Sequence, residues 1–127
     1  MTRLHVQGAA FAVLLALWTW KLVSPSPVPD ELRARLAELD LTFVAAKALH
    51  LSGYALLAAL AGTLPVPRYG RAFLVGLLVL HGVATEVAQL FVENRTGKAS
   101  DVLIDWIGIA LGILAVQLWP RRRERRP

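Results

Sequence analysis

The residues that decide the fold of this 127-residue chain are 86–108, EVAQLFVENRTGKASDVLIDWIG. This stretch begins near the end of one long apolar run and finishes inside the next. The polar connection between the two runs contains Asn94, Arg95 and Gly97, which predicts a tight turn. We therefore expect a hairpin of two helices joined at this turn.

Three carboxylates, those of Glu86, Asp101 and Asp105, lie within or at the edge of these apolar runs. A charged side chain at the centre of a bilayer costs about 2.5–3.5 kcal/mol, so such residues usually pair, face inward and mark a functional site. The alternative is that the three lie near a helix end, reach water and only pin the hairpin.

The composition favours a membrane protein. Hydrophobic residues make up 56% of the chain, against about 45–50% in soluble domains. The absence of cysteine excludes disulfides and Cys-based metal or redox chemistry. The net charge of +5 comes from basic residues that lie mainly in connections and the C-terminal tail, so it indicates membrane topology rather than nucleic-acid binding.

Four apolar runs have about the 20 residues that a helix needs to cross a bilayer. They cover residues 4–23, 42–64, 69–92 and 99–119, and a basic tail follows at 120–127. A Trp-Thr-Trp-Lys sequence at 18–21 follows the first run, where a signal peptide would have a small-residue cleavage site, so we expect a retained helix. The predicted fold is an all-α membrane protein, a four-transmembrane-helix bundle in a single domain, 1–127.

The connection between the first two runs is expected to hold a short amphipathic helix. The proline-rich residues 24–29 end the first helix. Leu32, Leu36 and Leu39 then recur at helical spacing among charged residues, which predicts a helix lying in the membrane interface. A solvated connector is the alternative.

The basic residues predict the orientation of the chain. Four spans place both termini on one face, with Arg3, Arg68, Arg71 and the tail arginines. The opposite face holds Lys21, Arg33, Arg35, Lys47, Arg95 and Lys98. Because the tail cluster adjoins a helix end, where basic residues count most, we expect a multi-pass membrane protein with both termini in the cytoplasm.

Polar side chains fall on one face of each of the last three predicted spans. They are Lys47, His50 and Tyr54 on the second span, Glu86 and Gln89 on the third, and Asp101 and Asp105 on the fourth. We expect these faces to converge on one shallow, outward-facing pocket. Gly108 and Gly112 continue the fourth face as a G-x-x-x-G pattern, which allows close helix packing.

The residues of this pocket suggest two kinds of chemistry, metal binding and acid–base catalysis. His50 and the carboxylates could ligate a divalent metal, but no H-E-x-x-H or comparable spacing is present, and we expect neither a metal nor a cofactor. His50 and Glu86 could instead form an acid–base pair, which makes them the candidate catalytic residues. Ser100 resembles a helix N-cap.

Over residues 47–112 the chain resembles the VanZ-like family of small bacterial membrane proteins. The matching positions are Lys47, His50, Tyr54, Glu86, Gln89, Arg95, Thr96, Gly97, Asp101, Asp105 and Gly108. Ala46, Leu51 and Thr85 depart from the family pattern, and two of these changes remove an acid, which weakens a metal site.

The resemblance implies a protein of the cell envelope, in a family associated with resistance to the glycopeptide antibiotic teicoplanin. We expect the pocket to bind a lipid-linked, anionic or glycopeptide-like ligand, with Lys47, Arg95 and Lys98 contacting anionic groups. Arg95 is suited to a bidentate phosphate contact. A binding role is expected rather than an enzymatic one.

Two alternatives to ligand binding are a membrane enzyme acting on a lipid headgroup and a purely structural hairpin. Membrane lipids are the expected partners, and the chain can form an oligomer.

Overall fold

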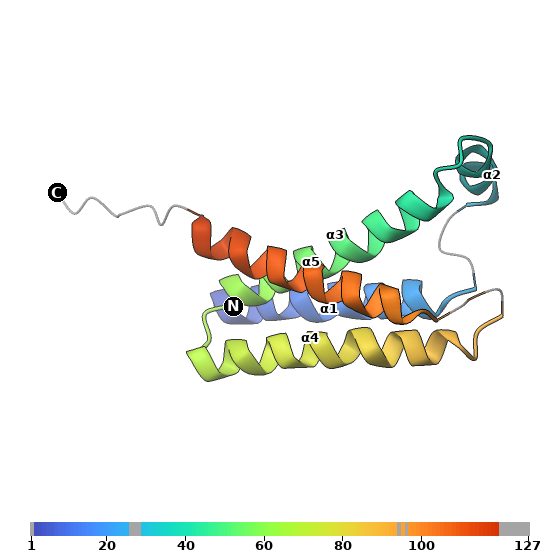
Figure 1. Ribbon diagram of the computed structural model, residues 1–127. Coiled ribbons are helices and arrows are strands. Elements are labelled where there is room, and N and C mark those ends of the chain that lie inside the picture. The colour runs from blue at the N-terminus through green and yellow to red at the C-terminus, as the bar shows by residue number, and fades with distance from the viewer. Residues whose placement is uncertain (1, 26–28, 94, 96, 120–127) are drawn as a thin grey trace.

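The computed structural model describes residues 2–25, 29–93, 95 and 97–119, and within these ranges the chain is helical and has no strand (Figure 1). The basic tail at 120–127 and Thr96 lie outside the described residues. The five helices are α1 (Arg3–Val23), α2 (Asp30–Glu38), α3 (Thr42–Thr63), α4 (Arg68–Gln89) and α5 (Ala99–Leu118).

Four of these helices, α1, α3, α4 and α5, are long and apolar enough to cross a membrane, which confirms the predicted fold class. Their outward side chains are largely apolar, as at Phe73 and Leu80, which are each 70% exposed. The third span ends at Gln89 rather than at residue 92, because the backbone tightens into turns after Val87 and Ala88. Such an outer surface suits contact with lipid tails.

The connecting helix α2 forms where the leucine spacing predicts it. It lies at one end of the molecule beside the start of α3 (Figure 1). Leu32 and Leu36 face a cavity, whereas Leu39 caps the helix end and is 66% exposed. Asp40 follows with φ of 55°, a left-handed conformation that reverses the chain before α3. The placement of α2 in the membrane interface stays a prediction.

The α3–α5 contact is the most extensive between helices, and glycine makes it possible. A Cβ atom added at Gly108 would lie 2.4 Å from the carbonyl oxygen of Leu51, and one at Gly112 would lie 2.2 Å from that of Ala55. No other side chain fits at such distances, so the G-x-x-x-G pattern brings the two backbones together.

The helix α1 packs on α3 and α4. Gly53 of α3 allows this approach, because the indole of Trp18 occupies the space that a Cβ would need. Trp18 also meets the Tyr54 ring edge-to-face, with centroids 6.0 Å apart. The ends of α1, α4 and the start of α5 therefore gather at the α2 end of the molecule, where the predicted pocket residues lie (Figure 1).

Candidate functional site

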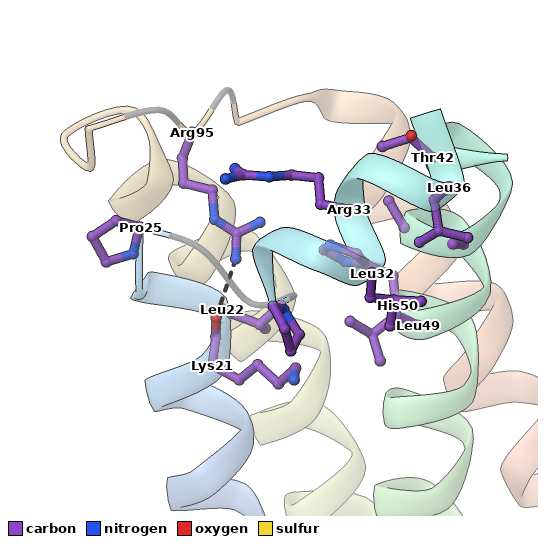
Figure 2. Close-up of a pocket in the computed structure, with 13 residues that line it drawn as sticks. Lys21, Leu22, Pro25, Leu32, Arg33, Leu36, Thr42, Leu49, His50 and Arg95 are labelled. Atoms are coloured by element: carbon purple, nitrogen blue, oxygen red, sulfur yellow. Dashed lines mark hydrogen bonds between the residues drawn. The ribbon is translucent and has the colours of Figure 1, made fainter. Parts of the chain in front are cut away.

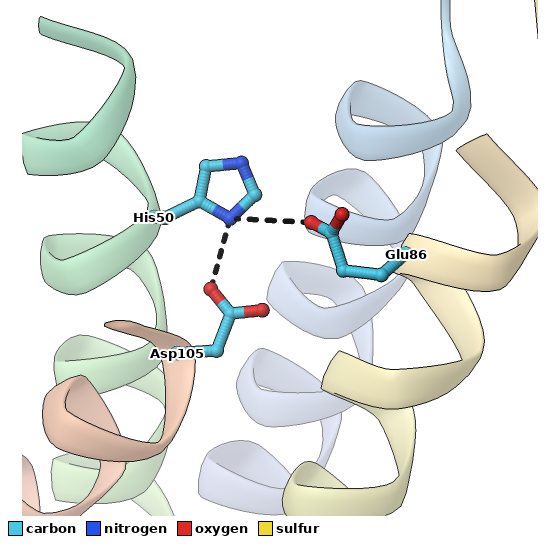
Figure 3. Close-up of side chains that lie close together, drawn as sticks. All are labelled: His50, Glu86 and Asp105. Atoms are coloured by element: carbon cyan, nitrogen blue, oxygen red, sulfur yellow. Dashed lines mark hydrogen bonds and ion pairs between the residues drawn. The ribbon is translucent and has the colours of Figure 1, made fainter. Parts of the chain in front are cut away.

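Three helices bring one histidine and two carboxylates together below α2. We call His50 of α3, Glu86 of α4 and Asp105 of α5 the outer cluster (Figure 3). The His50 Nδ1 atom lies 2.9 Å from Oδ1 of Asp105 and 4.0 Å from Oε1 of Glu86. All three side chains are buried, and Asp105 is completely inaccessible. His50 thus bonds to Asp105 rather than to Glu86, the partner expected from the sequence.

The two carboxylates of the outer cluster are positioned by the backbone around them. Oε2 of Glu86 accepts a hydrogen bond of 2.8 Å from the backbone N–H of Lys98, which orients Oε1 toward His50. This bond also fixes the start of α5. The prediction that Ser100 caps this helix is wrong, because α5 begins at Ala99 and its N-cap is Lys98.

Two oxygen atoms of the outer cluster lack a protein partner. Oε1 of Glu86 and Oδ2 of Asp105 are buried without a hydrogen bond to any described residue. Buried carboxylate oxygens normally accept hydrogen bonds or bind ions, so each exception needs an explanation. Both atoms belong to the same small group of side chains around His50.

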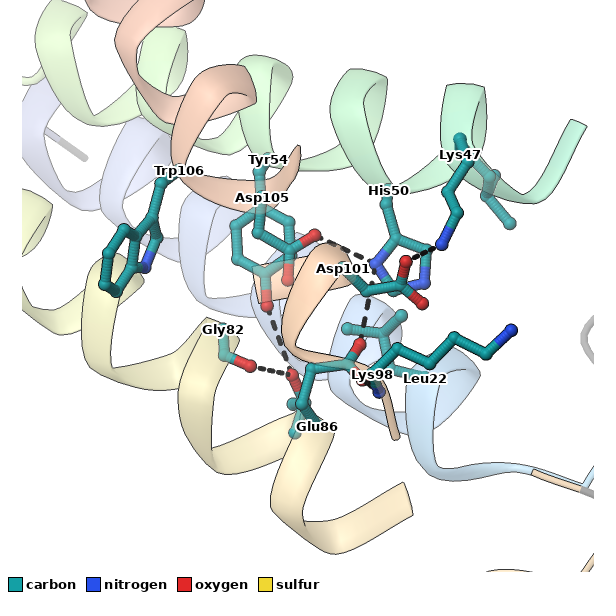
Figure 4. Close-up of polar contacts among 12 residues, drawn as sticks. Leu22, Lys47, His50, Tyr54, Gly82, Glu86, Lys98, Asp101, Asp105 and Trp106 are labelled. Atoms are coloured by element: carbon teal, nitrogen blue, oxygen red, sulfur yellow. Dashed lines mark hydrogen bonds and ion pairs between the residues drawn. The ribbon is translucent and has the colours of Figure 1, made fainter. Parts of the chain in front are cut away.

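One turn nearer the α2 end, Lys47 forms an ion pair with Asp101 (Figure 4). Both side chains are mostly buried, at 16% and 12% exposed. The Lys47 ammonium also lies 5.1 Å from the centroid of the Phe43 ring, within the range of a cation–π contact. These contacts join α3 to α5, and the positive charge of Lys47 is already used inside the protein.

A second polar group lies deeper in the protein, on α1, α3 and α4. We call Thr19, Tyr54, His81 and Thr85 the inner cluster. The Tyr54 hydroxyl is 2.9 Å from Nδ1 of His81 and 3.3 Å from the Thr85 hydroxyl, and Nε2 of His81 is 2.8 Å from the Thr19 hydroxyl. Tyr54 is therefore placed in an internal network that links α1, α3 and α4.

Two predicted ligand-binding residues hold the end of α1. The Gln89 side chain is 2% exposed and donates a hydrogen bond to the carbonyl of Leu22. Nε and Nη2 of Arg95 donate to the carbonyls of Ser24 and Lys21. Burial lowers the pKa of the Arg95 guanidinium, and the Glu86 carboxylate partly offsets this, so the group stays charged. The Nε/Nη2 edge is thus not available for a bidentate phosphate contact.

A cavity of about 480 Å³ lies under α2, between the end of α1 and the start of α3. Its lining includes the cations Lys21, Arg33 and Arg95, and His50 lies in its wall (Figure 2). The other described lining residues are apolar or uncharged: Leu22, Pro25, Pro29, Leu32, Leu36, Thr42, Ala45, Ala46 and Leu49. The cavity therefore combines positively charged side chains with largely apolar walls.

A second hollow continues along the seam between α1 and α3. It is lined by Leu14, Trp18, Ser52, Gly53, Leu56 and Leu57. Trp18 is about one turn from Leu22, and Gly53 about one turn from Leu49, so the hollow lies roughly a helical turn below the cavity. A cavity that carries cations on apolar walls and an apolar groove thus lie along the same α1–α3 seam.

Only part of the predicted site forms the cavity. Of the eight predicted ligand-binding residues, His50 and Arg95 line it, and the other six are placed in internal contacts. Sequence reasoning missed the lining by Lys21 and Arg33 and the inner cluster residues His81 and Thr85. The i, i+4 and i+8 spacing of His81, Thr85 and Gln89 on one face of an apolar helix was the available signal.

Comparison with known proteins gives one match. The model of a protein family described as VanZ/LLP1 matches residues 11–120. Searches of curated proteins and of solved structures found no match.

Proposed function

The chain belongs to the VanZ/LLP1 family, and we propose that it binds an anionic amphiphile, a lipid or lipid-linked molecule with a phosphate-like headgroup. The observation that carries this proposal is the cavity under α2, where Lys21, Arg33 and Arg95 meet apolar walls. Three cations and no acidic residue are among the described lining, and although Arg33 also forms an exposed ion pair with Asp30, this favours a negatively charged ligand.

The size and the surroundings of the cavity support an amphiphile in particular. Its volume of about 480 Å³ is in the range of small-molecule pockets, so it suits a headgroup rather than a whole glycopeptide. The apolar hollow along the α1–α3 seam would hold the first part of an alkyl chain. The leucines of α2 would then cover the headgroup from the membrane surface.

The test compares two arginines of α2 that differ in position. Arg33 lines the cavity and Arg35, two residues later, does not. We expect Arg33→Gln and Lys21→Gln each to weaken binding of short-chain phosphatidic acid by about tenfold or more, since a hydrogen bond to a charged group contributes about 1.5–3 kcal/mol. Arg35→Gln should keep wild-type affinity in calorimetry of the detergent-purified chain. Equal effects of Arg33→Gln and Arg35→Gln, or equal binding of phosphatidylcholine, would contradict the proposal.

The location of the cavity on the outer face of the bacterial inner membrane is part of the proposal. The described cations at the α2 end outnumber those at the opposite end, so this orientation depends on the tail arginines. Because the chain has no cysteine, single substitutions can report it. An impermeant thiol reagent should label Glu93→Cys and not Pro65→Cys in intact cells, and the reverse pattern would place the cavity inside.

A membrane enzyme acting on the headgroup is the second candidate function. It is favoured by the position of His50, which lines the cavity and is held at Nδ1 by Asp105. A carboxylate that orients an imidazole in this way is typical of a general base. Turnover of a bound phospholipid that is lost in His50→Gln, while binding is kept, would establish this candidate. Decreased teicoplanin susceptibility on expression is a separate expectation from the family resemblance.

A further inference from the structure

The outer cluster has the composition and spacing of a metal site, although the sequence offered no metal-binding motif. One ligand atom from each of His50, Glu86 and Asp105 lies within 4.8 Å of the other two (Figure 3). Two ligands of one zinc ion, each at about 2.0–2.2 Å, lie no more than roughly 4.4 Å apart. Small side-chain adjustments therefore suffice to bring all three atoms onto one ion.

An independent observation points to a ligand at this place. The carboxylate oxygens Oε1 of Glu86 and Oδ2 of Asp105 are buried without a described partner, in side chains that are 5% and 0% exposed. Oε1 is the atom that faces His50, at a distance too long for a hydrogen bond. Buried carboxylates are typically paired or bound to metal, because an uncompensated charge is costly to bury.

The surroundings of the cluster hold its members in place for coordination. The Lys98 backbone N–H occupies the other oxygen of Glu86, which is how metal-binding carboxylates are usually oriented. Gly82 lets Asp105 approach α4, because a Cβ there would lie 3.3 Å from Oδ2. Lys47 is paired with Asp101 and does not neutralise the two carboxylates by direct contact.

We propose that His50, Glu86 and Asp105 bind one divalent transition-metal ion of the zinc or manganese type. Imidazole suits zinc and carboxylate suits manganese, and the divalent charge balances two carboxylates. Three protein ligands leave further coordination positions on the ion. Since His50 lies in the cavity wall, such a position would be near the ligand proposed above, but the metal site does not depend on that ligand.

The test titrates Zn²⁺ alone into the full-length, tag-free chain in detergent after removal of metals with a chelator. We expect one equivalent to bind by calorimetry, and Co²⁺ to produce visible absorption bands. Glu86→Gln and Asp105→Asn should each weaken Zn²⁺ binding at least tenfold. Asp101→Asn is the matched control, a carboxylate on α5 one turn from Asp105, and should keep the stoichiometry of one.

Two further measurements distinguish loss of metal binding from misfolding and separate the metal site from the lipid site. Zn²⁺ should raise the melting temperature of the wild type by about 5 °C or more and leave Glu86→Gln unchanged, which covers the case in which Asp105→Asn does not fold. Absence of saturable binding by the wild type, or wild-type affinity in Glu86→Gln, would overturn the metal site. Lipid binding measured with chelator present reports the proposed function separately, so either proposal can fail alone.

Discussion

The outer and inner clusters share the helices α3 and α4, yet their hydrogen bonds differ. In the inner cluster every one of the four side chains has a described partner, and the bonds join hydroxyl groups to one another and to the imidazole of His81. The outer cluster concentrates two carboxylates around one imidazole and leaves two oxygens without a partner. A satisfied network locks helices together, whereas an unsatisfied one has been retained at a cost in stability. The difference separates a structural cluster from a candidate functional one.

The largest effect on stability is expected at the α3–α5 seam, which brings His50 and Asp105 of the outer cluster together. Gly112→Leu would place a side chain against the carbonyl of Ala55 and force the helices apart. Overpacking of this kind typically costs about 1–3 kcal/mol. The melting temperature of the Gly112→Leu variant in detergent should be clearly lower than that of the wild type. Gly76→Leu is the control, since nothing lies within 4 Å of a Cβ there, and an equal decrease in both variants would exclude seam packing as the cause.

An intermediate effect on stability is expected from a substitution in the inner cluster. Tyr54→Phe removes the hydroxyl that contacts His81 and Thr85 but keeps the ring beside Trp18. Hydrogen bonds between membrane helices contribute about 0.6–1.7 kcal/mol, so unfolding in denaturant should shift by a similar amount. Binding of lipid or Zn²⁺ should not change. A folded Tyr54→Phe protein that binds neither would show that the two clusters are not separate in function.

The smallest effect on stability is expected from the outer cluster. Glu86→Gln keeps an oxygen that can accept the Lys98 N–H bond and removes one of two adjacent buried charges. We expect the free energy of unfolding without metal to change by less than about 1 kcal/mol, the net contribution of a single hydrogen bond, because Oε1 of Glu86 has no described partner to lose. Binding of Zn²⁺, measured by calorimetry, should nevertheless be weakened at least tenfold. Strong destabilisation by Glu86→Gln would instead make the outer cluster a structural element like the inner one.

The fold could be predicted from the sequence because its signals are local. Apolar runs of about 20 residues, the proline-rich stop after α1 and the leucine spacing of α2 each depend on a few neighbouring residues. The faces carrying His50, Glu86 and Asp105 also follow from helical periodicity, and the structure brings these three residues together.

The details of the site could not be predicted, because they depend on distances between helices. Spacing along α4 does not reveal that Asp105, rather than Glu86, is within bonding distance of His50. It also does not reveal that the Arg95 guanidinium reaches back to the carbonyls of Lys21 and Ser24. Lys21 and Arg33 looked like ordinary interfacial cations, and only the fold of α2 over α3 places them around one cavity.

The contacts of Gln89 and Arg95 with the end of α1 have a consequence for biogenesis. The bonds cross 67 to 74 positions of the chain, so the carbonyls at the end of the first span leave the ribosome long before their donors, the side chains of Gln89 and Arg95, are synthesised. In the bilayer, the end of α1 therefore cannot form these hydrogen bonds until the last hairpin is inserted. The docking of this end is a late step of assembly. We expect α1, expressed as a separate peptide, to associate with a chain that lacks it, and Arg95 to be the residue that recruits it.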